Sequence, residues 1–302
     1  MPTAENLKSG FVAVVGRPNA GKSTLLNRLV GTKVSIVTRV PQTTRNRILG
    51  VVHRPGAQIV LMDTPGIHKP LSRLNEQMMQ FVRQALGDLD IALLIVDASV
   101  PFGHGDQFAV DLIKRYGPKT FLLLNKIDLI RKSRLLPLID RYRQLHEFQE
   151  IFPLSALDGP GVEEMLQAVM RELPEGPAYF PPEMITDQPE RFLAGEIIRE
   201  KLIQQTRQEL PFATAVLVEE FDRNEKLTHI QATIVVEKES QKPIVIGAGG
   251  SKLKQIGTAA RLDLERRFPP KVFLELFVKV ARDWRDDHAM VRTLDYRGEG
   301  GG

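Results

Sequence analysis

The segment from Phe11 to Val30, FVAVVGRPNAGKSTLLNRLV, constrains the fold more than any other part of the chain. It joins an apolar run, a glycine-containing loop and an amphipathic run without interruption, an order that predicts a strand, a loop and a helix. The loop GRPNAGKS matches the pattern G-x-x-x-x-G-K-[ST] in this context. Gly16 and Gly21 allow the backbone to curl so that successive N–H groups face phosphate oxygens. The segment therefore predicts a layered α/β domain with a phosphate-binding loop.

This loop and the first turn of the following helix supply most of the candidate contacts to a nucleotide. Lys22 can reach the β- and γ-phosphates, which also makes it a candidate catalytic residue, and the Ser23 hydroxyl can ligate Mg²⁺. The candidate nucleotide-binding residues of the segment are Gly16, Arg17, Pro18, Asn19, Ala20, Gly21, Lys22, Ser23 and Thr24.

Four further short apolar runs follow in the first half of the chain: IVLMDTPG, IALLIVDA, TFLLLNKID and IFPLSA. Like the first run, they are mostly apolar on both faces, which is typical of strands in a parallel sheet that helices cover on both sides. Amphipathic stretches separate them, and one of these predicts a helix through Leu74, Met78, Phe81 and Leu86. We expect a P-loop NTPase of the α/β class with a mostly parallel sheet.

Three motifs at the ends of these runs indicate the nucleotide. In DTPG, Asp63 is expected to hold Mg²⁺ through water and the Gly66 N–H to sense the γ-phosphate. NKID places Asp128 just past a strand end, where ligands bind in open α/β sheets. A carboxylate there can accept hydrogen bonds from N1–H and the exocyclic amine of guanine, a donor pair that adenine lacks. These motifs predict a guanine nucleotide.

The rest of these motifs completes the candidate site. We expect Asn125 to tie the second loop to the first, the stem of Lys126 to lie along the base, and the SAL backbone to meet the guanine O6. The motifs add the candidates Asp63, Thr64, Pro65, Gly66, Asn125, Lys126, Asp128, Ser155, Ala156 and Leu157.

Composition excludes several other classes of protein. The chain has no cysteine, so it contains no disulfide framework, thiolate metal site or cysteine nucleophile. Its six histidines lack metal-ligand spacing. No apolar run reaches the length of a membrane span, and the first residues lack the pattern of a secretory signal. We therefore expect a cytoplasmic protein.

A proline-rich stretch divides the chain into two domains. Five prolines between Leu173 and Pro189 argue against a continuous helix or a central strand there. We expect a nucleotide-binding domain over 1–174, an ordered linker over 175–189 and a second domain over 190–302. The second domain is predicted as helix, strand, strand, helix, glycine turn, helix and strand, an α+β arrangement.

The motifs together resemble one family. GRPNAGKST, PQTTRNRILG, DTPGIHKP and NKID, followed by VIGAGGSKLKQIG and FVKVARDW, are similar to the Era family of bacterial ribosome-assembly GTPases from about Gly10 to Leu294. The resemblance implies a Ras-like GTPase domain followed by a type II KH domain. The implied reaction converts GTP and water to GDP and phosphate, with GTP or GDP and Mg²⁺ as ligands.

The resemblance also implies roles in the first switch. Related GTPases carry Thr-Arg at the threonine that completes the Mg²⁺ shell, which favours Thr44 over Thr43. Ile67 stands where Ras-type enzymes have the glutamine that orients water, so we expect slow intrinsic hydrolysis. Asn19 has two interpretations: it binds K⁺ beside the phosphates, as in related GTPases, or it only shapes the loop.

The second glycine-rich loop predicts a different ligand. GAGGSK lacks the gap of a nucleotide loop, but its G-x-x-G between two helices matches the turn with which KH domains clamp single-stranded RNA. Nine basic and three acidic residues between 242 and 282 surround it. Ala248 and Gly249 stand where KH loops usually carry a basic residue, so flanking lysines must supply the charge. The candidate RNA-binding residues are Ile244, Ile246, Gly247, Ala248, Gly249, Gly250, Ser251, Lys252 and Lys254, and Ile256 is expected to line the adjacent apolar groove.

The partners follow from the resemblance alone. It implies binding to the 3′ end of small-subunit ribosomal RNA, a role in 30S subunit maturation and peripheral association with the inner face of the membrane; we also expect a monomer that does not bind DNA. Two competing hypotheses are an RNA-binding adaptor that holds GTP as a structural ligand and an ATP-dependent kinase, which Asp128 disfavours. Trp284 is interpreted as a packing anchor, with RNA stacking as the alternative.

Overall fold

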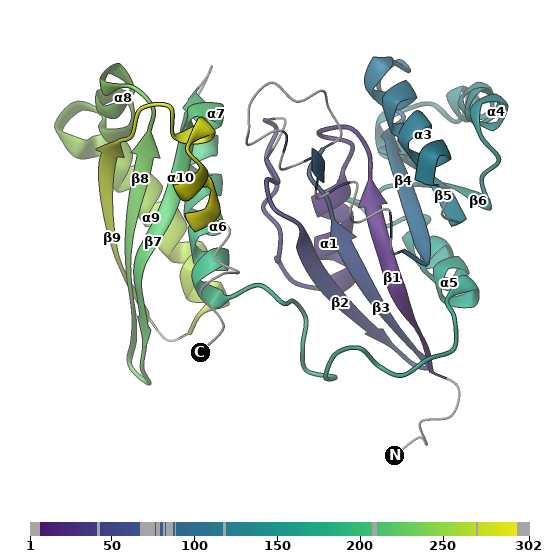
Figure 1. Cartoon of the computed structure of the whole chain (residues 1–302), viewed down its shortest axis with the longest axis horizontal. Coiled ribbons are helices and arrows are strands. Elements are labelled where there is room, and N and C mark those ends of the chain that lie inside the picture. Colours follow the sequence, from purple (N-terminus) through teal and green to yellow (C-terminus); the bar gives the residue numbers. More distant parts are fainter. Residues whose placement is uncertain are drawn as a thin grey trace. The chain divides into compact units, whose positions relative to one another are not determined.

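A computed structural model describes residues 7–40, 43–66, 76, 79–80, 82, 87, 89–116, 119–206, 210–269 and 271–294. The chain divides into two compact units, with the division in the main chain between Asp187 and Gln188 (Figure 1). Four residues on which a helix is predicted, Leu74, Met78, Phe81 and Leu86, lie outside the described residues, as does Ile67.

The first unit is built on a six-stranded sheet in the order β2-β3-β1-β4-β5-β6. All neighbouring strands are parallel except β2 and β3, which pair antiparallel at one edge. Its elements are β1 (Lys8–Val15), α1 (Lys22–Val30), β2 (Ile48–Arg54), β3 (Ala57–Asp63), β4 (Ile91–Asp97), α3 (His104–Tyr116), β5 (Lys119–Asn125), α4 (Leu135–Leu145), β6 (Glu150–Leu154) and α5 (Val162–Glu172). This is the mostly parallel α/β architecture that the apolar runs predict, and it agrees with the Ras-like domain that the family resemblance implies.

The central strands are buried on both faces, which explains their continuous apolar sequences. Alternate residues of one face, such as Ala13, Leu94 and Leu122, pack with buried side chains of α3 and with Tyr142 of α4. α1 contacts β1, β2 and β3, and α5 contacts β6. The parallel arrangement brings the carboxyl ends of β1, β4, β5 and β6 to one edge, where the loops of the motifs emerge.

The proline-rich stretch is attached to the first unit by hydrogen bonds. The side chain of Gln58 accepts from the N–H groups of Tyr179 and Phe180 and donates to the Phe180 carbonyl. Farther along, Thr186 donates to the Leu49 carbonyl at 2.6 Å. Since the polar groups of a proline-rich segment have few partners of their own, these contacts give it a defined course along the sheet.

The second unit is an α+β domain with a three-stranded sheet in the order β7-β8-β9. β7 and β8 form an antiparallel hairpin, and β9 pairs parallel with β8. Its elements are α6 (Glu190–Gln205), α7 (Leu210–Ala213), β7 (Thr214–Arg223), β8 (Leu227–Val236), α8 (Lys242–Ile246), α9 (Ser251–Arg267), β9 (Lys271–Val280) and α10 (His288–Thr293). This order matches the predicted KH domain, with the glycine turn between α8 and α9.

Candidate functional site

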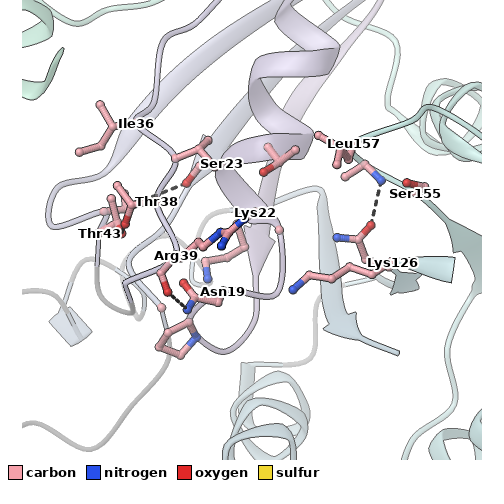
Figure 2. A pocket seen from close by; sticks show the side chains of 18 of the residues that line it. Asn19, Lys22, Ser23, Ile36, Thr38, Arg39, Thr43, Lys126, Ser155 and Leu157 are labelled. Carbon is pink, nitrogen blue, oxygen red and sulfur yellow. Dashed lines mark hydrogen bonds between the residues drawn. The ribbon is translucent and has the colours of Figure 1, made fainter. Parts of the chain in front are cut away.

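A cavity of about 520 Å³ lies at the carboxyl edge of the first sheet (Figure 2). Loops that follow β1, α1, β3, β5 and β6 surround it, so segments far apart in the sequence converge on one space. The lining residues are Pro18, Asn19, Gly21, Lys22, Ser23, Thr24, Ile36, Val37, Thr38, Arg39, Thr43, Thr44, Gly66, Asn125, Lys126, Asp128, Leu129, Ser155, Ala156 and Leu157.

The phosphate-binding loop closes around the ammonium of Lys22. Lys22 Nζ donates to the carbonyls of Gly16 at 3.0 Å and Arg17 at 2.9 Å. Burial lowers the pKa of Lys22 to about 8, and the charge of Asp63 partly offsets this effect. Gly21 has a φ of +107°, and a Cβ there would lie 2.1 Å from Asn125 Nδ2, so only glycine fits. The loop thus has the curl and the positive charge that phosphate requires.

Beneath this loop, hydroxyl groups gather around the carboxylate of Asp63. Asp63 Oδ2 accepts hydrogen bonds from Ser23 Oγ at 2.7 Å, Ser35 Oγ at 2.9 Å and Thr44 Oγ1 at 3.5 Å. Its Oδ1 atom is buried and has no hydrogen-bond partner among the described residues. Burial raises the pKa of Asp63, against the opposing effects of Lys22 and the three hydroxyls. Hydroxyl and carboxylate oxygens are ligands that suit Mg²⁺, so the residues fit this ion.

Thr44 rather than Thr43 joins this group. The Thr44 side chain is buried, and its Oγ1 lies 3.0 Å from Ser23 Oγ. Thr43 instead donates to the Val40 carbonyl at 2.7 Å, and its Oγ1 lies 2.7 Å from Thr38 Oγ1. The geometry therefore favours Thr44 as the threonine that acts with Ser23 and Asp63.

Asn125 and Lys126 organise the other end of the cavity. Asn125 Nδ2 donates to the Ala20 carbonyl at 2.7 Å, and its Oδ1 accepts from the Ala156 N–H at 2.8 Å. One side chain thus connects the phosphate-binding loop with the SAL loop. Lys126 Nζ lies 2.5 Å from Asp97 Oδ2, and its stem lies along the cavity wall (Figure 2).

Asp97 is held in its charged form. Burial alone would raise its pKa, but hydrogen bonds from Lys126 and Ser99 outweigh burial and leave the pKa of Asp97 below its usual range. Asp97 is thereby an anchor for Lys126 that sequence reasoning missed, although its place at the carboxyl end of β4 was a usable signal.

Unlike the buried Asn125 and the half-buried Lys126, Asp128 is exposed, and it lines the cavity. It lies in a single 3-10 turn, Ile127–Leu129, directly after β5. No hydrogen bond or ion pair involves its side chain within the described part of the chain. A carboxylate in this state can accept from two adjacent N–H donors of a base.

Six of the predicted nucleotide contacts do not line the cavity. Arg17 turns away and forms an ion pair with Asp106 at 2.8 Å, and Thr64 is buried and donates to the Val14 carbonyl. The full set is Gly16, Arg17, Ala20, Asp63, Thr64 and Pro65. Most of these residues support the loops from below, because their main chain or buried side chains carry the hydrogen bonds described above.

Five lining residues were missed by the sequence analysis: Ile36, Val37, Thr38, Arg39 and Leu129. Four of them belong to the segment between α1 and β2, which Asn27 pins to the helix by accepting from the N–H groups of Val34 and Ser35. Asn19, whose backbone is left-handed at φ +62°, also donates to the Arg39 carbonyl (Figure 2). The sequence did contain one indication of these residues. The segment lies between the phosphate-binding loop and Thr44, so it must pass the site.

The second glycine loop forms an open turn between α8 and α9. Gly249 and Gly250 have φ angles of +56° and +79°, and a Cβ at either would meet no described atom within 4 Å. The predicted residues Ile244, Gly247, Ala248, Ser251, Lys252 and Lys254 all lie at this turn or in the flanking turns of helix, and Ile246 is half-buried. The long α9 presents its N-terminus to this opening, which suits an anion.

The groove beside this turn differs from the one predicted. Ile256 is fully buried in the core, so the expectation that it lines the groove was wrong. A cavity of about 400 Å³ lies instead between α9 and β9 and is lined by Gly250, Leu253, Lys254, Gly257, Thr258, Arg261, Leu274 and Leu276. The difference has a simple cause: Ile256 lies on the face of α9 that packs inward together with Ala260 and Leu264.

The two interpretations of Trp284 are resolved by its burial. Trp284 is 1% exposed and donates from Nε1 to the Ala213 carbonyl at 3.0 Å, so it is a packing anchor rather than a stacking platform for RNA.

α6 buries residues such as Phe192, Ile198 and Leu202 in the domain core. None of the described helices has the length and apolar character needed to cross a membrane.

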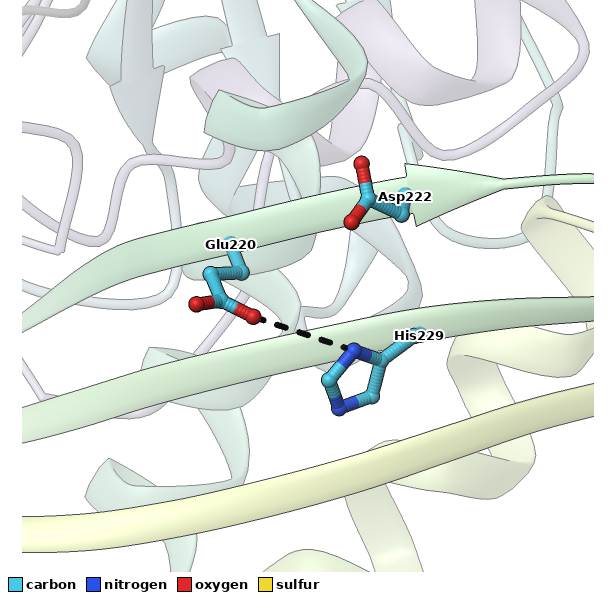
Figure 3. A group of neighbouring side chains, drawn as sticks. All are labelled: Glu220, Asp222 and His229. Carbon is cyan, nitrogen blue, oxygen red and sulfur yellow. Dashed lines mark ion pairs between the residues drawn. The ribbon is translucent and has the colours of Figure 1, made fainter.

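Although the histidines lack metal-ligand spacing in the sequence, the fold brings His229 next to two carboxylates. It lies on β8 opposite Asp222 of β7, with Glu220 on the same face, and their ligand atoms fall within 4.8 Å of one another (Figure 3). His229 Nε2 also lies 2.9 Å from Glu275 Oε2. Because a ring nitrogen of His229 already has the Glu275 carboxylate as its hydrogen-bond partner, this exposed group carries no argument for a metal site.

Comparisons with known proteins agree with both halves of this description. Residues 11–126 match the family of 50S ribosome-binding GTPases, and residues 209–285 match the KH domain. GTPase Era of Syntrophus aciditrophicus is 51% identical over 291 residues, covering 96% of this chain and 95% of that protein. GTPase Era of Geobacter metallireducens is 48% identical and covers 96% and 98%.

Two solved structures share the whole architecture. Era in complex with MgGDPNP and nucleotides 1506–1542 of 16S ribosomal RNA is 42% identical, with a TM-score of 0.93 and coverage of 96% of this chain and 99% of that one. A tyrosine-to-alanine variant of Aquifex aeolicus Era bound to GDP·AlF4⁻ is 41% identical, with a TM-score of 0.92 and the same coverage. Because these similarities extend over nearly the entire chain, it belongs to the Era family of GTPases.

Proposed function

We propose that this protein is a GTP-hydrolysing switch that binds the 3′ end of small-subunit ribosomal RNA and assists 30S subunit assembly. The single observation that carries the proposal is the complex of a 42% identical Era with MgGDPNP and 16S ribosomal RNA, matched over 96% of this chain. The chain's own cavity supports a guanine nucleotide, because the exposed Asp128 carboxylate lines it.

For hydrolysis, the chain's residues hold the phosphates and the metal. Lys22 neutralises charge on the β- and γ-phosphates, and the Gly66 N–H is the candidate contact to the γ-phosphate. Ser23, Thr44 and Asp63 would hold Mg²⁺, with Asp63 acting through water. When bound, Mg²⁺ supplies charge stabilisation to the phosphates that react. The water-orienting glutamine of Ras-type enzymes is replaced by Ile67, so we predict slow hydrolysis in the absence of a partner.

RNA is proposed to bind at the glycine turn. The absence of side chains on Gly249 and Gly250 lets a sugar-phosphate backbone approach the N-terminus of α9, and Lys252 and Lys254 supply charge. Bases would then reach the groove between α9 and β9, where Leu274 and Leu276 offer apolar surface. This assignment combines close backbone approach with an adjacent apolar floor, as single-stranded RNA recognition requires.

The deciding experiment measures GTP hydrolysis with and without a short RNA copied from the 3′ end of small-subunit ribosomal RNA. A parallel protein carries Gly250→Asp, which places a carboxylate where phosphate should bind, and Gly250→Ala is the neutral control. We expect stimulation by RNA that is lost only in the aspartate variant. Hydrolysis that is unaffected by RNA would contradict a coupled switch, and absent hydrolysis would favour the adaptor that holds GTP as a structural ligand.

A dependence on K⁺ is proposed for the same assay. Asn19 Nδ2 is occupied by the Arg39 carbonyl, which leaves its Oδ1 as the side-chain oxygen that can face a cation beside the phosphates. We expect faster hydrolysis in K⁺ than in Na⁺ and no such difference in Asn19→Ala. Equal rates in both salts would mean that Asn19 only shapes the loop and holds Arg39.

Localisation follows from the proposed partner. We propose a monomer that acts in the cytoplasm on the 30S subunit, without binding DNA, and that also associates peripherally with the inner face of the membrane. The support for the membrane part is the family resemblance, since α6 directs its apolar side chains into its own domain. Sedimentation with anionic vesicles tests it, and recovery of all protein in the supernatant would contradict it.

A further inference from the structure

Arg28 connects the helix of the phosphate-binding loop with the SAL loop. It lies in the last turn of α1, and its Nε donates to the Ala156 carbonyl at 2.6 Å while a second guanidinium nitrogen donates to the Leu157 carbonyl. Arg28 forms no ion pair with a carboxylate in the described part of the chain. Its fork of donors is therefore directed at two successive main-chain carbonyls.

These two hydrogen bonds determine the orientation of the peptide groups in the loop. In a trans peptide the carbonyl and the following N–H point in opposite directions. When Arg28 holds the Ala156 carbonyl, it therefore directs the Leu157 N–H away from α1. Leu157 belongs to the lining of the nucleotide cavity.

The N–H of Leu157 is also available to a ligand, whereas those of its neighbours in the loop are occupied. The N–H groups of Ser155, Ala156, Asp158 and Gly159 donate to the Pro160 carbonyl, Asn125 Oδ1, Ser155 Oγ and the Ser155 carbonyl, respectively. No acceptor is found for the Leu157 N–H among the described residues. A donor that is held in place and unpaired at the wall of a binding cavity is suited to an acceptor on the ligand.

We propose that Arg28 is a positioning residue for guanine recognition, which orients the Leu157 N–H toward the O6 atom of the base. The positive charge also polarises the peptide that it holds and makes this N–H a stronger donor. Gly159 leaves space for the guanidinium, because a Cβ there would lie 3.1 Å from an Arg28 terminal nitrogen. The inference rests on the proposed binding of guanine nucleotides.

The test compares three ligands that differ at single positions of the base. GDP carries O6, 6-thio-GDP replaces O6 with the poorly accepting sulfur, and IDP keeps O6 but lacks the exocyclic amine that Asp128 is proposed to bind. Dissociation constants are measured for the wild type, Arg28→Leu and Arg28→Lys. Arg115→Leu, at the exposed end of α3, is the control for loss of a surface arginine.

In Arg28→Leu we expect GDP affinity to fall by up to about tenfold, the upper value for one neutral hydrogen bond, here that from the Leu157 N–H to O6. The preference for GDP over 6-thio-GDP shrinks, whereas the preference for GDP over IDP is kept. Arg28→Lys should keep part of the preference for GDP over 6-thio-GDP, because the lysine can donate to one of the two carbonyls. Equal losses for all three ligands, or an unchanged preference against 6-thio-GDP, would overturn the inference. A wild type that binds no GDP would overturn the proposed function as well.

Discussion

The two glycine loops of this protein both offer main-chain N–H groups at a helix N-terminus, yet they are built in opposite ways. The loop before α1 rests on a floor of buried polar groups, with Lys22 6% exposed and Asp63 fully buried. The turn before α9 has open space above Gly249 and Gly250. One loop encloses its ligand, and the other leaves its surface free for a long polymer.

The residues around the two loops also differ: those around the first are connected by hydrogen bonds, and the lysines at the second are separate. Asn125, Asp97 and Arg28 connect the segments around the nucleotide cavity, so that a change in one of them reaches the others. At the second turn, Lys252 and Lys254 act as separate exposed or half-exposed charges. We therefore expect substitutions to have large, cooperative effects at the first loop and small, additive effects at the second.

The two loops should differ most in their response to the replacement of one glycine by alanine. In Gly21→Ala the Cβ meets Asn125 Nδ2 at 2.1 Å, so Asn125 must leave its two hydrogen bonds. We expect GTP affinity to fall by at least about 100-fold, since the lost bonds and the altered curl together cost on the order of 3 kcal/mol. Gly250→Ala adds only the strain of a left-handed alanine, about 1–2 kcal/mol of unfolding free energy.

Titration with a fluorescent GTP analogue and urea unfolding measure these two effects. Gly31→Ala is the matched control at the C-terminal end of α1, because Gly31 has a φ of +82° and a Cβ there meets no described atom within 4 Å. It should lose stability and keep GTP affinity. If Gly21→Ala behaved like Gly31→Ala, the first loop would be as tolerant as the second and the comparison would fail.

Much of the first unit was predictable because buried parallel strands have a distinctive sequence. Runs such as Ile91–Asp97 are apolar almost throughout, and their ends must meet at one edge of the sheet. The motif residues at these ends therefore had to come together, which is why the lining of the cavity contains most of the predicted residues. The KH domain was predictable for a different reason, from the order of its elements and the G-x-x-G turn.

Contacts between distant segments were not predictable from local pattern. The edge strand β2 was missed because it contains Gly50 and ends in polar residues, and its pairing with β3 provides much of its stability. The course of the proline-rich stretch depends on Gln58, which lies 121 residues from Tyr179. Ile256 was misplaced because helix periodicity alone did not reveal which face of α9 packs inward.

A smaller effect is expected at Asp97, which anchors Lys126. In Asp97→Asn the ion pair at 2.5 Å is lost, and the Lys126 ammonium no longer has a carboxylate that holds it in place. We expect GTP affinity to fall about tenfold and the unfolding free energy by roughly 1–3 kcal/mol, the value of hydrogen bonds to a charged group. Nucleotide titration and urea unfolding check both values, with Asp111→Asn on the exposed surface of α3 as the control.

The stability that is lost in Asp97→Asn should depend on pH and become smaller as the pH falls. The pKa of Asp97 in the folded protein lies below its usual value, so its contribution is fully present above the unfolded pKa of about 3.9. It disappears as the pH falls through the lower, folded pKa. The difference in stability between wild type and Asp97→Asn should thus be constant from about pH 7 to pH 5 and narrow below about pH 4. A difference that stays constant at low pH would show that the ion pair is not its source.

The smallest individual effects are expected at the lysines of the second turn. Each of Lys252→Ala and Lys254→Ala should weaken RNA binding a few-fold and reduce the slope of log affinity against log salt by about 0.7, as expected for one phosphate contact to a single strand. The double variant should show the sum, because exposed charges act separately, and GTP hydrolysis without RNA should not change. Lys226→Ala in the β7–β8 turn is the control. A loss in the double variant far above the sum would mean that this turn is as interconnected as the loop around Lys22, and would remove the contrast between the two.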